Sequence, residues 1–263
     1  MPAAAGSAVV LIIAVALALY FSRPVFLVFV GMLVLLASWE IAGAMARKQV
    51  TVTLIPIYLA AIAILAAAAM GQVLWVLVAV YVAVLAIVVT RMAWSTLPGA
   101  PITDIMASVF TLIYVPVFGS FVALISARDD SPWPLVFFIV VVVCNDLGGW
   151  LAGIMFGKHP MAPKLSPKKS WEGFAGSVIL CGVAGYLATL TLDIQWWWAV
   201  PMALTGSVIG TLGDLTESLI KRHVGLKDMS GIMPGHGGIM DRLDSLLLCA
   251  PAFYLIYSLA LGW

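Results

Sequence analysis

The sequence contains very little charge. Asp, Glu, Lys and Arg make up only 10% of its 263 residues, whereas 63% are hydrophobic, and the mean hydropathy is +1.13. The 3 cysteines lie singly in apolar segments, which indicates neither a disulfide framework nor a zinc site. The basic residues form no stripe and the formal net charge is only +1, so no nucleic-acid partner is indicated. The same composition excludes a soluble globular protein.

Apolar segments long enough to cross about 30 Å of hydrocarbon recur along the chain. We therefore predict an all-α, polytopic integral membrane protein with about nine transmembrane helices. Gly, Pro and charged residues divide the apolar segments and set the ends of each span. The predicted spans are 4–21, 25–45, 51–70, 72–90, 101–126, 132–157, 171–192, 196–221 and 244–262.

The basic residues predict how these spans are oriented. When the spans alternate across the bilayer, eleven Lys and Arg residues fall on one side and only Arg23 and Arg128 on the other. Basic loop residues gather on the cytoplasmic side of membrane proteins. We therefore predict that the N-terminus and the loops 158–170 and 222–243 face the cytoplasm, and that the C-terminus faces outward.

Charge is concentrated in residues 214–244. Asp241 and Asp244 are three positions apart at the start of the last span, so on a helix they share a face, and Asp214 and Glu217 have the same spacing in span eight. Mg²⁺ is usually held by one or two carboxylates together with substrate phosphates. These pairs predict a Mg²⁺ site that serves phosphate chemistry. In the alternative interpretation the acids only pair with the nearby Arg222 and Arg242.

A glycine-rich turn, Pro234-Gly235-His236-Gly237-Gly238, precedes the last span. Glycine lets backbone N–H groups approach an anion closely, as in loops that cradle phosphate. Lys227 before the turn and Asp241-Arg242 after it strengthen this interpretation. His236 either donates to a phosphate or only caps the turn.

A second cluster begins inside span six. Asp146 lies deep in an apolar segment, and a carboxylate within a membrane predicts a functional site. The loop that follows carries Ser166, Lys168 and Lys169, which suit a triphosphate or a phospholipid phosphate. Lysines that act only as topological anchors are the alternative.

Two further acids lie in apolar surroundings. Asp104 follows Pro101 near the start of a span, where capping of the helix N-terminus is the simpler explanation. Glu40 lies about two-thirds along span two, and its role is left open.

Residues 218–244 resemble the signature of the phosphatidate cytidylyltransferase family, also called CDP-diacylglycerol synthase. Met233 stands where the family has Leu, Ile or Phe, and Leu147-Gly-Gly-Trp150 departs from the Thr-Gly-Ala-Tyr usually found there. The stretch from Asp146 to the Ser166-Pro-Lys-Lys-Ser-Trp-Glu-Gly run also resembles the family. The matching signature residues are Ser218, Lys221, Arg222, Lys227, Asp228, Ser230, Pro234, His236, Asp241, Arg242 and Asp244.

The resemblance implies a membrane enzyme that converts CTP and phosphatidate into CDP-diacylglycerol and pyrophosphate. Mg²⁺ is the implied cofactor, with a second metal ion left open, and a homodimer in the inner or plasma membrane is the implied assembly. A single domain over 1–263 would combine N-terminal helices in 1–130 with catalytic helices and cytoplasmic loops in 131–263. The implied metal ligands are Asp146, Asp214, Asp241 and Asp244, which with Lys227 form the catalytic set. The implied substrate-binding residues are Ser166, Lys168, Lys169, Ser218, Lys221, Arg222, Gly235, His236, Gly237, Gly238 and Arg242.

Two other functions fit parts of the pattern. An ion-coupled or proton-coupled transporter would use acids within the membrane as its pathway, namely Glu40, Asp104, Asp146 and Asp214. A CTP-dependent polyprenol kinase would also need Mg²⁺ and a cytoplasmic nucleotide site, but it would release CDP in place of pyrophosphate.

Overall fold

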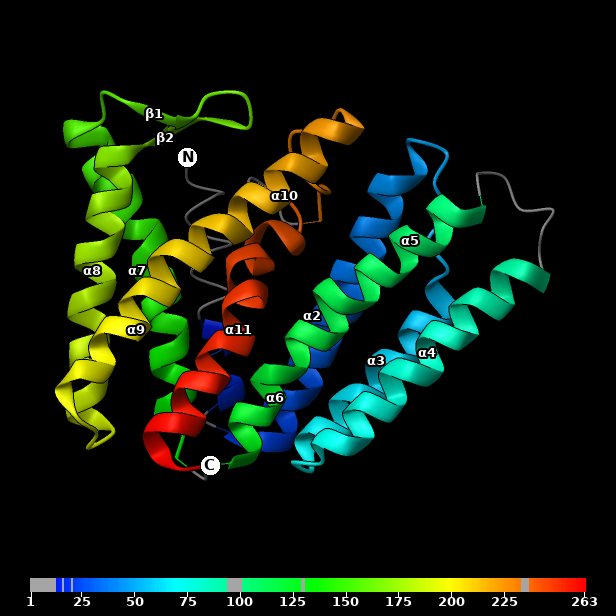
Figure 1. Cartoon of the computed structure of the whole chain (residues 1–263), viewed down its shortest axis with the longest axis horizontal. Helices are drawn as coiled ribbons and strands as arrows, with labels where there is room; N and C mark the ends of the chain where they lie inside the picture. The colour runs from blue at the N-terminus through cyan, green and yellow to red at the C-terminus, as the bar shows by residue number, and fades with distance from the viewer. Residues whose placement is uncertain (1–12, 16, 20, 94–100, 129–130, 233–236) are drawn as a thin grey trace. The chain divides into compact units, whose positions relative to one another are not determined.

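A computed structural model describes residues 13–15, 17–19, 21–93, 101–128, 131–232 and 237–263 of the chain. These residues are almost entirely helical (Figure 1), and a two-stranded sheet, β1 and β2, joins two of the helices. The elements before the sheet are α2 (Arg23–Ala46), α3 (Leu54–Ala69), α4 (Val73–Ala93), α5 (Pro101–Leu112), α6 (Phe118–Arg128) and α7 (Trp133–Phe156). The remaining elements are β1 (Pro160–Ala162), β2 (Ser166–Ser170), α8 (Trp171–Thr191), α9 (Ala199–Leu204), α10 (Gly210–Val224) and α11 (Met240–Leu261).

Six of the described helices are long and apolar enough to cross a membrane. This finding confirms an all-α, multi-pass membrane protein, whereas the count of nine spans stays a prediction. The predicted span 51–70 corresponds to the shorter α3, and most of span 4–21 lies outside the described residues. The six helices are Arg23–Ala46, Val73–Ala93, Pro101–Arg128, Trp133–Phe156, Trp171–Thr191 and Met240–Leu261.

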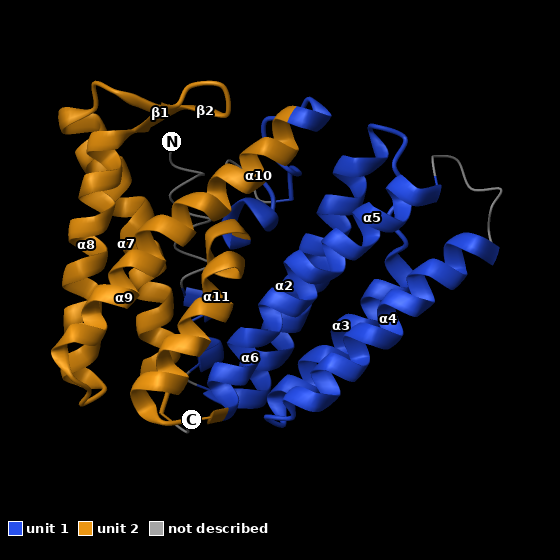
Figure 2. Ribbon diagram, viewed as in Figure 1, with its two compact units in different colours: residues 1–127, 223–243 blue, residues 128–222, 244–263 orange. Residues whose placement is uncertain are grey.

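The described chain forms two compact units (Figure 2). Unit 1 comprises residues 1–127 and 223–243, and unit 2 comprises residues 128–222 and 244–263. The loop that precedes α11 therefore belongs to the unit of the N-terminal helices. The prediction of a single domain is not decided by this division.

Short irregular helical turns interrupt two of the spans. A π-helical turn, Ile113–Val117, contains Pro116 and joins α5 to α6, and a second π-helical turn, Thr205–Ile209, joins α9 to α10. A 3₁₀ turn, Trp196–Trp198, precedes α9. Proline has no N–H to donate and clashes with the preceding turn, which explains the wider helix at Pro116.

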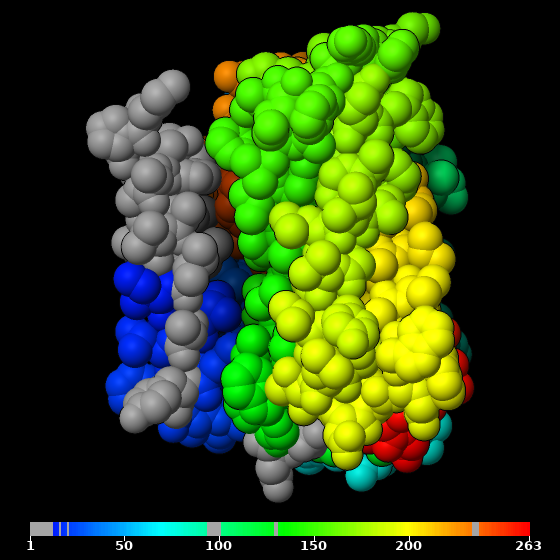
Figure 3. All heavy atoms as spheres, turned by 90° about the vertical axis from the view of Figure 1, so that its left-hand side faces the viewer, coloured from blue at the N-terminus to red at the C-terminus, as the bar shows by residue number. Residues whose placement is uncertain are grey.

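Helices α7 and α8 of unit 2 run side by side in two views (Figure 1 and Figure 3). Glycines allow this close approach: a Cβ added at Gly148 would lie 2.5 Å from the carbonyl oxygen of Gly176. Ser177 also donates a hydrogen bond of 2.6 Å to the carbonyl oxygen of Asn145. Small residues at a helix interface and hydrogen bonds between helices hold membrane helices together.

This packing predicts opposite effects for two similar substitutions on α8. Gly176→Ala should lower the free energy of unfolding by about 1–3 kcal/mol, because its Cβ would lie 2.4 Å from the Cβ of Ala152. Gly182→Ala should raise the free energy of unfolding by about 0.5–1 kcal/mol, because nothing lies within 4 Å and alanine is the better helix former. Thermal unfolding of both variants in detergent tests this contrast, and equal shifts would contradict it.

The loop 158–170 contains an element that the sequence did not predict. β1 and β2 pair antiparallel, with Pro160 opposite Ser170 and Ala162 opposite Ser166. Ser170 then caps α8, because its side chain accepts a hydrogen bond of 3.1 Å from the N–H of Gly173. The hairpin thus leads directly into the helix that packs on α7.

Candidate active site

Helix α10 is held against two other elements of unit 2 through its small residues. A Cβ at Gly213 would lie 2.6 Å from the carbonyl oxygen of Asp244, and a Cβ at Gly210 would lie 3.1 Å from the side-chain nitrogen of Asn145. Ser245 donates a hydrogen bond of 2.9 Å to the carbonyl oxygen of Gly210. The polar faces of α7, α10 and α11 are therefore brought together without bulky side chains between them.

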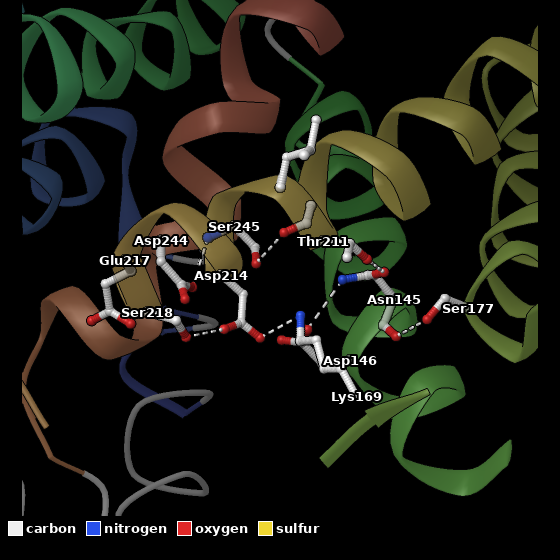
Figure 4. A network of polar contacts seen from close by, with 12 residues as sticks. Asn145, Asp146, Lys169, Ser177, Thr211, Asp214, Glu217, Ser218, Asp244 and Ser245 are labelled. Atoms are coloured by element: carbon white, nitrogen blue, oxygen red, sulfur yellow. Dashed lines mark hydrogen bonds and ion pairs between the residues drawn. The ribbon is translucent and has the colours of Figure 1, made fainter. Parts of the chain in front are cut away.

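Three predicted metal ligands come together there. Figure 4 shows Asp146 of α7, Asp214 of α10 and Asp244 of α11 in one polar network. Asp244 is only 8% exposed and lies within electrostatic reach of both other carboxylates. Three acids close together repel one another, and a cation between them would balance their charge.

Lys169 supplies one such cation. Its Nζ lies 2.6 Å from a carboxylate oxygen of Asp214. Lys168, the preceding residue on β2, is exposed. Successive side chains of a strand point to opposite faces, so only one of the two lysines faces the acids. The sequence did not distinguish these two lysines, which both stay predicted phosphate ligands.

Other predicted residues of unit 2 also have partners within the protein. Lys221 donates a hydrogen bond of 2.5 Å to Glu217, which is only 1% exposed, so the acid predicted to pair with Asp214 is bound to a lysine one turn later. Ser218 donates to Asp214 at 3.3 Å. Arg222 donates to the carbonyl oxygen of Leu165 at 3.3 Å, which connects α10 to the hairpin turn. Ser166 lies half-buried at the start of β2.

Asn145 connects this site to its surroundings, and sequence reasoning gave it no role of its own. Its side-chain nitrogen donates to Asp146 at 3.1 Å, and its oxygen accepts from Thr211 at 3.2 Å. Asn145 is 2% exposed. An amide beside an acid at the end of a run of apolar residues was the signal that the sequence offered.

The remaining predicted residues belong to unit 1. Asp241 accepts hydrogen bonds from the N–H groups of Met229 at 3.0 Å and Gly238 at 2.7 Å. Gly237 has a φ of +80°, a conformation that glycine adopts without strain. Lys227 and Arg242 are exposed. The predicted site residues Gly235 and His236 lie outside the described residues.

Asp104 and Glu40 also have partners within unit 1. Asp104, which we expected to cap its own helix, forms a buried ion pair with Arg91 and accepts a hydrogen bond of 2.8 Å from the N–H of Thr51. Glu40 accepts hydrogen bonds from the loop that precedes α11. The contacts of Glu40 and the contact of Asp104 with Thr51 join segments far apart in the sequence, which sequence patterns do not reveal.

The acids of unit 2 fit a hard cation that binds together with its substrate. Within the described residues, no group of three or more His, Cys, Asp or Glu side chains is arranged to hold a metal ion by itself. Mg²⁺ needs only one or two carboxylates when substrate phosphates supply the other oxygens. Asp214 and Asp244 offer such oxygens, so their chemistry fits this ion.

Comparison with known proteins identifies relatives of the chain. The sequence model of the cytidylyltransferase family matches residues 3–260. Proteins named phosphatidate cytidylyltransferase are similar in Mycobacterium bovis (41% identity over 164 residues, 62% of this chain and 53% of the relative) and Mycobacterium leprae (41% over 169 residues, 62% and 54%). The protein of that name in Bacillus subtilis is 39% identical over 134 residues, which are 50% of each chain. The matched part of this chain spans about half the length of these relatives.

Proposed function

Because this chain belongs to the cytidylyltransferase family, we propose that it transfers the cytidylyl group of CTP to phosphatidate. The products would be CDP-diacylglycerol and pyrophosphate, and the reaction would supply phospholipid synthesis. The polar network of Asp146, Asp214, Asp244 and Lys169 (Figure 4) carries this proposal, because it brings together acids from α7, α10 and α11 and a lysine from β2.

The reaction needs no covalent intermediate with the enzyme, but it does need the negative charge of the phosphates to be balanced. A phosphate oxygen of phosphatidate forms a bond to the α-phosphorus of CTP, and the bond from that phosphorus to the bridging oxygen of pyrophosphate breaks. Near neutral pH the phosphate monoester already carries enough negative charge to attack without a general base. The protein therefore has to align the two phosphates and balance their charge.

The chain's own residues divide this work. Asp214 and Asp244 would hold Mg²⁺, and Asp146 and Asp241 are the further predicted ligands. When bound, Mg²⁺ supplies positive charge to the phosphate oxygens. Lys169 would orient a phosphate while it keeps Asp214 in place. Ser218 and Asn145 fix the carboxylates of Asp214 and Asp146 through the hydrogen bonds described above.

We further propose that the enzyme works as a homodimer in the inner or plasma membrane, with its site facing the cytoplasm. The excess of basic residues on one side of the predicted spans supports this orientation. CTP is a cytoplasmic nucleotide, which agrees with a site that faces the cytoplasm. The two contacts of Asp104 and the three contacts of Glu40 give these acids structural partners, so they do not favour a transport pathway.

The proposal is tested with purified protein, CTP labelled at the α-phosphate and phosphatidate. With Mg²⁺ we expect label in the lipid and one pyrophosphate for each lipid-linked cytidine. Omission of phosphatidate is the control and should leave the label in CTP. Release of CDP with a polyprenol acceptor would instead identify the kinase, and no nucleotide turnover would overturn the proposal.

A further inference from the structure

Glu40 is a buried carboxylate of α2 that the proposed reaction does not use. It is 2% exposed. It accepts three hydrogen bonds, from the hydroxyl of Ser230 at 2.5 Å and from the N–H groups of Ile239 at 2.9 Å and Met240 at 2.7 Å. All three donors lie in the loop before α11 or in the first residue of that helix, within unit 1.

These contacts satisfy the N-terminus of α11 from within the protein. The first N–H groups of a helix have no partner in the helix itself and attract anions. Ile239 and Met240 donate to Glu40, and the N–H of Gly238 donates to Asp241 at 2.7 Å. Three successive backbone donors, the kind of group that cradles a phosphate, are thus already bound by two carboxylates of this chain.

Gly238 is needed for the approach of Glu40. A Cβ at this position would lie 2.6 Å from both carboxylate oxygens of Glu40, a distance that real Cβ atoms do not show. Glu40 is itself buried and its carboxylate accepts three hydrogen bonds, so its side chain cannot move aside without breaking them. The glycine therefore makes room for a carboxylate of the protein.

We propose that Glu40 is a positioning residue that fixes Ser230, Ile239 and the first turn of α11. That helix carries both Asp241 and Asp244, so a loose first turn would disturb two of the acids assigned to Mg²⁺. Glu40 acts through the loop and does not touch substrate. This inference rests on the proposed cytidylyl transfer for its effect on the reaction, whereas its effect on the loop does not depend on it.

The test compares Glu40→Gln and Gly238→Ala with Gly231→Ala. Glutamine keeps the length of the side chain but replaces one accepting oxygen with an NH₂ group that faces other donors. Gly238→Ala should displace the carboxylate of Glu40 by placing a Cβ where its oxygens lie. Gly231→Ala is the matched control, because Gly231 lies in the same loop with nothing within 4 Å of an added Cβ.

The first measurement is amide hydrogen exchange of the whole protein in detergent. In Glu40→Gln and Gly238→Ala we expect the amides of Ile239 and Met240 to exchange about tenfold to a hundredfold faster than in wild type, the ratio expected when a hydrogen bond to a charged group is lost. Peptides of α7 and α8 should be unchanged. Wild-type exchange at residues 239 and 240 in both variants would overturn the inference, whatever the enzyme catalyses.

The second measurement is steady-state kinetics. We expect kcat to fall about tenfold in both variants with the KM for CTP nearly unchanged, because the alignment of catalytic groups is lost and the binding groups remain. Glu40→Gln combined with Gly238→Ala should lose no more activity than either alone. Wild-type kcat in both single variants would overturn the positioning role, and an inactive wild-type enzyme would overturn the proposed function instead. If Glu40→Gln fails to fold, Ser230→Ala, which removes one donor, must show a smaller change of the same kind or the inference fails.

Discussion

Asp244→Asn is expected to lower kcat for the proposed synthesis of CDP-diacylglycerol by about a hundredfold or more. The amide keeps the shape of the side chain but removes the negative charge that would bind Mg²⁺. Activity measured over a range of Mg²⁺ concentrations should show that the remaining turnover needs more metal than wild type needs. Asp214→Asn should behave in the same way, because its carboxylate lies in the same network (Figure 4).

The stability of Asp244→Asn separates a metal ligand from a structural ion pair. Asp244 is buried and lies within electrostatic reach of two other acids, Asp214 and Asp146. Removing its charge relieves repulsion among these acids, so the variant should unfold at an equal or higher temperature than wild type when Mg²⁺ is absent. An acid that only neutralised a buried cation would show a fall in stability when changed to Asn.

Asp193→Asn is the matched control for this substitution. Asp193 is exposed after α8 and has a φ of +51°, a conformation in which Asn is at least as favourable. We expect wild-type activity and wild-type Mg²⁺ dependence from this variant. Near wild-type turnover of Asp244→Asn and Asp214→Asn at low Mg²⁺ would reject the metal assignment.

The sequence predicted the membrane helices well because their length is set by the thickness of the hydrocarbon. The predicted spans 25–45, 132–157 and 171–192 correspond closely to α2, α7 and α8. The hairpin of β1 and β2 was not predicted, because it lies in a polar loop with no apolar period to reveal it. The π-helical turns were not predicted either, since their hydrogen bonds differ from those of an α-helix by only one residue.

Sequence spacing located the candidate site but not its pairs of residues. Charges stand out in apolar segments, so Asp146, Asp214 and Asp244 were recognised individually. Helical spacing also suggested that Asp214 and Glu217 act together, whereas Glu217 is bound by Lys221 and Asp214 by Lys169. The second of these pairs joins a strand to a helix, and the partners of Glu40 lie about 200 positions away. Contacts of this kind depend on the fold and leave no local pattern.

The two neighbouring lysines of β2 should differ in their contribution to the reaction. We expect Lys169→Ala to lower kcat/KM for CTP by about tenfold to a hundredfold, because the variant loses both the predicted phosphate contact and the ion pair with Asp214, 2.6 Å away. Lys168→Ala should lower it by about threefold at most, because the exposed Lys168 points to the opposite face of the strand. Steady-state kinetics with purified proteins measures both.

A double variant shows whether Lys169 acts through Asp214. If the pair works as one unit, Lys169→Ala combined with Asp214→Asn should lose less activity than the product of the two single losses. Either substitution alone already breaks the ion pair, so the second breaks no further contact between these two residues. Independent losses would show that Lys169 contacts substrate without help from Asp214. Wild-type kinetics in both single lysine variants would instead show that the two lysines only anchor the loop on its side of the membrane. Their substitution should then change the orientation of the loop, which cysteine labelling measures.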